Sequence, residues 1–292
     1  MIKTIFLSIM KPTILVGGQA VIEGVMMRVP GYISTAVRDP HGDIITKREE
    51  FNTLIKKNKY LNLPIVRGAI SLFEAMKIGF RTLQWSADIS FPEEKQKQSK
   101  FTPILEWIMT IFSIVFALSL FILLPLGLTS WISNSDQHPM LYNIIAGAIR
   151  ITIFITYLFL ISKTKDAKRL FEYHGAEHMV VYTFENGDPL DVENSSKYPT
   201  QHPRCGTSFM FIVMLVAIIL FIIIDQIFIF IFGSITLLNR LVMHILFIPL
   251  VSGIGYEVLK FSSQNPNNII LRYFTMPGLW LQNITTNTPK ED

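Results

Sequence analysis

The sequence predicts an α-helical integral membrane protein with about four transmembrane helices and a small N-terminal α+β unit in the cytoplasm. Half of its 292 residues are hydrophobic and 16% are charged, well below the quarter that is usual in soluble domains. The apolar residues form blocks of roughly 20 residues or more, the length that a helix needs to cross a bilayer. Lys and Arg are concentrated in some connecting segments and missing from others.

Four apolar blocks are long enough to span the membrane, at residues 104–128, 141–162, 208–232 and 237–261. Fifteen Lys and Arg residues precede residue 104 and six lie in residues 163–206, whereas residues 129–140 contain none. Because Lys and Arg are enriched in cytoplasmic loops, we expect both termini and residues 163–206 in the cytoplasm. The chain is then a multi-pass protein of the inner or plasma membrane, with the lipid bilayer as its partner.

These blocks divide the chain into five predicted segments: a cytoplasmic β-hairpin unit with an amphipathic helix (12–100), two transmembrane helices (104–162), a cytoplasmic loop with a His/Cys cluster (163–207), two more transmembrane helices (208–261) and a cytoplasmic tail (262–292). Residues 1–10 are apolar but lack a small-residue cleavage site, so they do not read as a signal peptide. Residues 91–102, rich in Lys, Glu and Gln, predict a linker.

The N-terminal unit combines a predicted hairpin with a helix. Residues 33–38 and 44–51 are strand-like and flank the turn sequence Asp39-Pro40-His41-Gly42-Asp43. Pro64 then opens a predicted helix to about residue 87, whose apolar residues recur at helical spacing. This helix either packs on the β unit or lies on the membrane surface.

The sequence His174-Gly-Ala-Glu177-His178 lies in a helix that we expect over residues 166–184. Histidines four residues apart stand one helical turn apart and can face a single metal ion. His202-Pro-Arg204-Cys205 follows, so that three of the six histidines and the only cysteine lie within about 32 residues. The alternative is that histidines at a membrane boundary cap helices or contact lipid phosphate.

The expected cofactor is a divalent metal, with zinc favoured and iron or copper left open. His174, His178 and Cys205 would bind it and leave one position free, with Glu177 as the general base of an H-x-x-E-H metallohydrolase. His202 would be either a fourth ligand, which closes the site and makes the metal structural, or a partner of the ligands. A single cysteine in a reducing compartment argues against a structural disulfide.

Two further carboxylates stand out. Glu23 is the only charged residue in the Gly- and Met-rich residues 16–27, and we expect it to pair with Arg28 in preference to a metal. Gly17-Gly18-Gln19 resembles the tripeptide of peptide release factors, but nothing around it indicates a ribosome-binding domain. Glu257, at the cytoplasmic end of the last block, is expected to approach the 163–207 loop. The net charge of +4 is explained by the Lys and Arg residues of the expected cytoplasmic segments. It therefore predicts no nucleic-acid partner.

Arg150, Asp225 and His244 fall inside the apolar blocks, where charged side chains are costly and should face one another. We expect Arg150 to pair with Asp225 and His244 to lie near them. This intramembrane polar cluster either joins helices or forms part of an ion or proton path.

Five segments together carry a family resemblance: residues 17–28 (GGQAVIEGVMMR), 173–178 (YHGAEH), 202–207 (HPRCGT), 255–257 (GYE) and 277–286 (PGLWLQNITT). The chain resembles the YqhQ-like family of bacterial membrane proteins, a domain of unknown function (1385) labelled as a predicted metal-dependent enzyme. The resemblance covers residues 12–286. It implies an integral membrane protein with a metal at the residues named above, and it implies no particular reaction or substrate.

We therefore expect a metal-dependent membrane enzyme, with a hydrolase favoured, whose site faces the cytoplasm at the membrane surface. A lipid-linked substrate or a membrane peptide would suit such a site. The alternative is a non-enzymatic membrane scaffold or transport protein in which the metal is structural. A homo-oligomer or a membrane-protein partner stays open.

Overall fold

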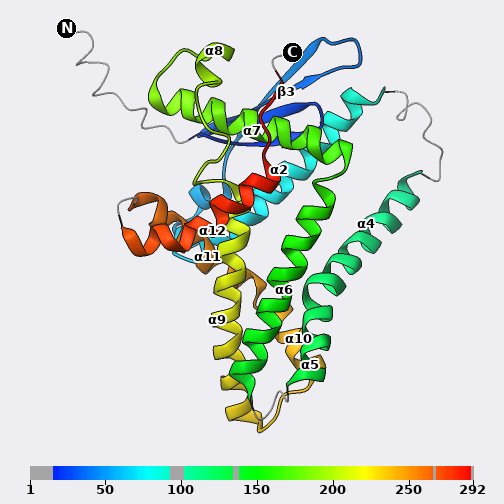
Figure 1. Cartoon of the computed structure of the whole chain (residues 1–292), viewed down its shortest axis with the longest axis vertical. Helices are drawn as coiled ribbons and strands as arrows, with labels where there is room; N and C mark the ends of the chain where they lie inside the picture. Colours follow the sequence, from blue (N-terminus) through cyan, green and yellow to red (C-terminus); the bar gives the residue numbers. More distant parts are fainter. Residues whose placement is uncertain (1–15, 93–101, 134–137, 266–267, 291–292) are drawn as a thin grey trace.

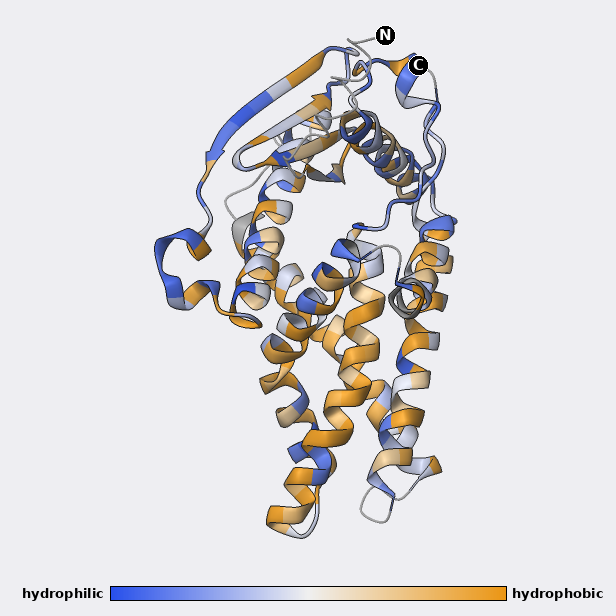
Figure 2. Ribbon diagram, turned by 90° about the vertical axis from the view of Figure 1, so that its left-hand side faces the viewer, coloured by the Kyte–Doolittle hydropathy of each residue, from blue (hydrophilic) through white to orange (hydrophobic). Residues whose placement is uncertain are grey.

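A bundle of long helices lies at one end of the molecule and a small sheet with its covering helices at the other (Figure 1). The computed structural model describes residues 16–92, 102–133, 138–265 and 268–290. Residues 1–10 and most of the predicted 91–102 linker lie outside these ranges. The bundle helices are apolar along most of their length, whereas the sheet end mixes polar and apolar residues (Figure 2). The chain is thus mostly helical with a small N-terminal sheet, as the sequence predicts.

The sheet has four antiparallel strands in the order β1-β2-β3-β4. The strands are β1 (Gly17–Val21), β2 (Gly24–Val29), β3 (Gly31–Arg38) and β4 (Ile44–Phe51). β3 and β4 form the predicted hairpin, with Thr35 opposite Lys47. In β3, Ile33, Thr35 and Val37 are buried at every second position, as expected for a strand with one covered face. The first two strands come from the Gly- and Met-rich run, where the sequence predicts a β-rich unit over residues 12–51 but no individual strand.

Helix α2 (Val66–Ser90) packs on this sheet, as in the first of the two predicted arrangements. Its Ile78 lies in one apolar cluster with Val21, Met26, Ile33 and Val37. Two 3-10 turns, η1 (Leu54–Lys57) and η2 (Lys59–Asn62), lead from β4 into the helix. The N-terminal turn of α2 packs tightly on α11 (Ile248–Gln264). Glycine at position 68 permits this contact, since a Cβ there would lie 2.8 Å from the carbonyl oxygen of Gly253.

Three helices are long and apolar enough to cross a membrane, judged by length and composition among the described residues. They comprise residues 107–132, built from α4 (Thr102–Leu118), the π-helical turn η3 (Ser119–Leu123) and α5 (Leu124–Ile132); α6 (Pro139–Ile161); and α9 (Gly206–Phe232). A fourth span results if α10 (Leu237–Leu246) and α11, bent by 50°, count as one. The bend lies just before Pro249, in the first turn of α11. Proline has no backbone N–H and its ring clashes with the preceding turn, so α10 cannot continue through it as a regular helix. These helices correspond to the four predicted blocks.

A buried polar cluster joins α6, α9 and α10, but the predicted pair within it is wrong. Asp225 accepts hydrogen bonds from Arg240 Nε and Asn143 Nδ2, each at 2.6 Å, and His244 Nε2 lies 3.4 Å away. Arg150 instead donates to the carbonyl oxygen of Phe121 in the π-helical turn, at 2.8 Å. Asn143 marks the position on α6 that contacts Asp225. Arg150 lies seven residues, or about 10 Å, further along this helix, which places it out of reach of the carboxylate.

The remaining helices surround the His/Cys segment. Helix α7 (Lys165–Asn186) begins after Thr164, whose side chain accepts from the Ala167 N–H, and ends at Gly187, which has a φ of 76°. It packs against β1 and β2. The short α8 (Val192–Ser195) follows it. The predicted C-terminal tail contains α12 (Ile269–Thr285), which packs along α9 and returns the chain to α7, where Asn287 N–H donates to Phe171 O at 2.9 Å.

Candidate metal centre

Three side chains with metal-binding atoms converge where α7 meets the start of α9. His174 and His178 stand one turn apart on α7 with ring centroids 4.5 Å from each other. Cys205 is the residue that caps the N-terminus of α9, and its Sγ lies 3.2 Å from His174 Nε2. One ligand atom from each of the three lies within 4.8 Å of the others. The structure therefore brings together three of the four predicted ligands, namely the two histidines one helical turn apart and the cysteine of the HPRC sequence.

Both histidine rings are oriented by backbone carbonyl groups. His174 Nδ1 lies 2.8 Å from the carbonyl oxygen of Thr285, and His178 Nδ1 is hydrogen-bonded to that of Thr200. A carbonyl oxygen only accepts, so each Nδ1 carries the proton and each Nε2 keeps its lone pair for a metal. Metal-binding histidines in proteins commonly make this hydrogen bond.

Cys205 Sγ accepts a long hydrogen bond from the backbone N–H of Thr207 at 3.4 Å. The side chain is buried, with 6% of its surface exposed. A metal-bound thiolate carries negative charge, and the amide groups at a helix N-terminus stabilise negative charge. The first turn of α9 therefore favours Cys205 as a ligand.

Glu177 lies beside the histidines in a partly open cavity of about 90 Å³, which is large enough for a few water molecules. Its carboxylate Oε2 is 3.5 Å from His178 Nε2, and the side chain is buried. Burial raises the pKa of Glu177 to about 7, although His174, the Gly18 N–H and Arg204 each act in the opposite direction. Burial also lowers the pKa of His174, against the effects of Thr285 and Glu177.

Gly18 contributes to this cavity, which the sequence does not predict. A Cβ at Gly18 would lie 2.8 Å from both Cγ and Oε1 of Glu177 and 2.6 Å from Met26 O, so only glycine fits. The next residue, Gln19, faces the other way and donates to Gly79 O of α2 at 3.2 Å. A glycine within a strand often marks a close approach of another group to the backbone. Gly18 was therefore the feature of the sequence from which this contact could have been predicted.

His202 lies beside the three-ligand group. Its Nδ1 accepts from the Arg204 N–H at 3.3 Å, and its Nε2 faces Glu185 Oε2 at 3.6 Å. Burial, together with nearby His178, lowers the pKa of His202 to about 4. The buried Gln282 of α12 holds the backbone of His202 at both its N–H (2.6 Å) and its carbonyl oxygen (2.8 Å). This geometry favours His202 as a partner of the ligands, and it adds Gln282 as a supporting residue that the sequence does not predict.

Residues 63–292 match the family described as "Protein of unknown function (DUF1385)". The chain belongs to this family. It is also 29% identical over 290 residues to the "Uncharacterized protein YqhQ" of Bacillus subtilis (strain 168), a match that covers 94% of this chain and 87% of that protein. No solved structure matches the chain. The resemblance to the YqhQ-like family is confirmed, whereas neither description names a metal or a reaction.

All three ligands, Glu177 and Gln282 lie within the matched residues 63–292, whereas Gly18 precedes them. The match to the Bacillus subtilis protein, by contrast, covers nearly the whole chain. The segment that matches the family therefore contains every candidate ligand of this chain, and the sheet adds Gly18 to the site.

Glu23 forms a salt bridge, but its predicted partner Arg28 is wrong. Glu23 lies in the turn between β1 and β2 and faces α7, where Arg169 Nη2 and the Tyr173 hydroxyl each approach its Oε2 at 3.0 Å. Burial alone would raise the pKa of Glu23, but the hydrogen bonds from Arg169 and Tyr173 outweigh it and the pKa is lowered. Arg28 lies further along β2 and stacks over Phe51.

Glu257 does not approach the 163–207 loop as predicted, because it pairs with Arg67. Two hydrogen bonds, at 2.7 and 2.5 Å, join the guanidinium to the carboxylate. The close packing of Gly68 on Gly253 explains this choice, since Glu257 stands one turn along α11 from that contact. Arg204, the last sequence candidate, lines the cavity and pairs with Glu185.

Proposed function

We propose that this chain is a metal-dependent membrane enzyme whose metal, zinc in preference, is held by His174, His178 and Cys205. The observation that carries the proposal is the orientation of the two imidazole rings. Both Nδ1 atoms are committed to backbone carbonyl oxygens, so two lone pairs and one sulfur are available in one small cavity.

The donor set suits zinc in kind and in spacing. Zinc binds imidazole nitrogen and thiolate sulfur, and a tetrahedral shell places such atoms roughly 3.3 to 3.6 Å apart. The separation of His174 Nε2 and Cys205 Sγ, 3.2 Å, is close to this value, and the whole set spans 4.8 Å. Small side-chain rotations would complete the shell. Three protein ligands leave a fourth position open, which is typical of catalytic zinc.

A hydrolase is the reaction class that the surrounding residues support best. A bound zinc ion supplies Lewis acidity toward a carbonyl or phosphoryl oxygen. Glu177 lines the same cavity, and its carboxylate, held by the Gly18 N–H, is placed to accept a proton from an attacking water. Arg204, which pairs with Glu185, lines the same cavity, where its remaining N–H donors could face the negative charge that develops during hydrolysis.

The site would lie at the membrane surface on the cytoplasmic side. Cys205 directly precedes α9, which is one of the candidate spans, so the ligands stand at the end of an apolar helix. The Lys and Arg residues of the 163–206 segment support a cytoplasmic location through their bias toward cytoplasmic loops.

Metal content measured by mass spectrometry on detergent-purified protein tests the proposal. We expect about one zinc per chain, lost in the His174→Ala/His178→Ala variant. The exposed turn residue His41 provides the control, because His41→Ala should leave the metal content unchanged. Absence of metal from wild-type protein that has never met a chelator would overturn the proposal.

A scaffold or transport protein with a structural metal is the second candidate. The buried polar cluster favours it, since among the described residues Asp225 Oδ1, Arg240 Nη2 and both ring nitrogens of His244 lack a hydrogen-bond partner. Glu177→Gln separates the two candidates. An enzyme should lose its role in cells while it keeps its metal and its thermal stability, whereas a structural site should tolerate the change.

A further inference from the structure

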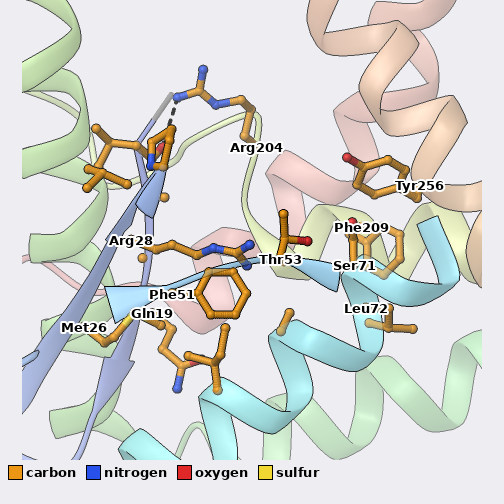
Figure 3. Close-up of a pocket in the computed structure, with 18 of the residues that line it drawn as sticks. Gln19, Met26, Arg28, Phe51, Thr53, Ser71, Leu72, Arg204, Phe209 and Tyr256 are labelled. Atoms are coloured by element: carbon orange, nitrogen blue, oxygen red, sulfur yellow. Dashed lines mark hydrogen bonds between the residues drawn. The ribbon is translucent and has the colours of Figure 1, made fainter. Parts of the chain in front are cut away.

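A pocket of about 620 Å³ adjoins the metal cavity, between the sheet, α2, the start of α9 and α11 (Figure 3). The two hollows share part of their walls, namely residues 16–18, Arg204 and Gly206. A volume of this size is typical of pockets for small ligands. A ligand in the pocket would therefore have one end next to Glu177 and the candidate metal ligands.

The pocket has an apolar lining with cations and no carboxylate. Its large apolar side chains are Met26, Phe51, Leu72, Ile78, Phe209 and Leu259. Arg28 and Lys56 also line it, as does Arg204, which is paired with Glu185, and none of the described lining residues is acidic. Such a surface is complementary to a molecule that is apolar along most of its length and negatively charged at one point.

Arg28 has hydrogen-bond donors to spare at this point. Its guanidinium stacks over the Phe51 ring at 4.3 Å, and Figure 3 shows it within the pocket. Arg28 forms a long salt bridge with Glu74, at 3.9 Å, and that carboxylate also accepts from the Thr53 hydroxyl and the Leu54 N–H. A guanidinium carries five N–H donors in a geometry that matches phosphate.

The apolar side of the pocket is continuous with two candidate spans. Phe209 stands in the first turn of α9 and Leu259 near the end of α11. The pocket thus adjoins the ends of two candidate spans, and acyl chains could remain along those helices while a headgroup enters. A soluble ligand would need no such continuity.

We infer that this pocket binds a phosphate-bearing lipid, with the phosphate on Arg28 and the acyl chains toward Phe209 and Leu259. Its role as the substrate class of the enzyme rests on the proposed function, whereas binding itself does not require the metal. The lipid headgroup then lies against the wall that the pocket shares with the metal cavity.

Native mass spectrometry of the delipidated, detergent-purified chain tests this with three probes: dioleoylphosphatidylglycerol, dioleoylglycerol and inorganic phosphate. We expect the phospholipid to bind, and Arg28→Gln to weaken it by about tenfold or more, because a charge-assisted contact is lost. Ala75→Trp, which fills the pocket from an exposed position of α2, should weaken it as well.

Arg48→Gln is the matched control. Arg48 also stacks on an aromatic ring of the same sheet, Tyr32 at 4.2 Å, but does not line the pocket. Equal phospholipid binding by the Arg28 and Arg48 variants would overturn the inference. Tight Arg28-dependent binding of inorganic phosphate alone, or equal binding of dioleoylglycerol, would overturn the assignment to a phospholipid.

The His174→Ala/His178→Ala variant separates this inference from the proposed function. Arg28-dependent phospholipid binding in that metal-deficient variant supports the inference even if wild-type protein carries no metal. Conversely, wild-type protein could bind metal while Arg28→Gln leaves phospholipid binding unchanged. That result would support the proposed function and overturn the inference.

Discussion

The His174 ring nitrogen Nδ1 lies 2.8 Å from the backbone carbonyl oxygen of Thr285, although 111 residues separate them in the chain. The C-terminal helix α12 thereby orients the first histidine of the H-x-x-E-H sequence. Thr200, in the loop after α8, does the same for His178. The candidate metal centre is therefore held by three segments distant in sequence, and changes in any of them should affect it.

Gly18→Ala should damage the site more than Gly17→Ala. A methyl group at Gly18 would lie 2.8 Å from the Glu177 side chain, whereas no contact within 4 Å from the described residues would meet a Cβ at Gly17. We expect Gly18→Ala to lower the free energy of unfolding by about 1–3 kcal/mol through overpacking and to displace Glu177. Thermal unfolding of both variants checks this, and equal unfolding temperatures would contradict it.

Replacement of Gln282 by Met should weaken metal binding from outside the ligand set. Gln282 is fully buried and binds both backbone groups of His202 and the Ser208 hydroxyl, so its loss leaves buried polar groups unpaired. We expect a loss of roughly 1–3 kcal/mol in stability and about 10–100-fold in metal affinity. A zinc titration compares it with Asn283→Ala at the exposed neighbouring residue. The idea fails if the two variants bind zinc equally.

Arg240→Met should destabilise the bundle far more than Arg150→Met. Removal of Arg240 leaves the Asp225 carboxylate buried without its charged partner, a loss of about 3–5 kcal/mol. Arg150 makes its hydrogen bond to a backbone carbonyl, so its removal leaves no charge unpaired. Unfolding in detergent measures both, and a double variant with Asp225→Leu should recover much of the loss. A larger effect from Arg150→Met would instead support the pair of Arg150 with Asp225 that the sequence predicts.

The Glu23–Arg169 pair predicts a pH dependence of stability. Because the folded-state pKa of Glu23 is lowered below its ordinary value of 4.5, the pair contributes its full stability above that pH. The contribution is lost as the pH falls through the folded-state pKa. Glu23→Gln should therefore unfold at a lower temperature than wild type at pH 7, with the gap closing in acid. A gap that is independent of pH would show that Glu23 acts through packing alone.

Patterns within single segments were enough to predict the spans, the β3–β4 hairpin and the candidate ligands on α7. Each follows from local chemistry: apolar length, a Pro/Gly turn, or histidines one helical turn apart. Cys205 could be predicted as well, because the chain offers no other thiol. These features depend little on which element lies beside which.

Only the tertiary structure decided how the segments meet. Asp225 pairs with Arg240 because α10 brings that side chain beside α9, a contact that no local pattern encodes. The bounds of β1 and β2 escape prediction within the β-rich residues 12–51, because glycines and methionines replace the usual alternation, and Gly18 is needed for the approach of Glu177. Likewise, α12 supplies a carbonyl oxygen and Gln282 to the site. Residue spacing sets which side chains share a helix face, whereas packing between helices sets which partner each face receives.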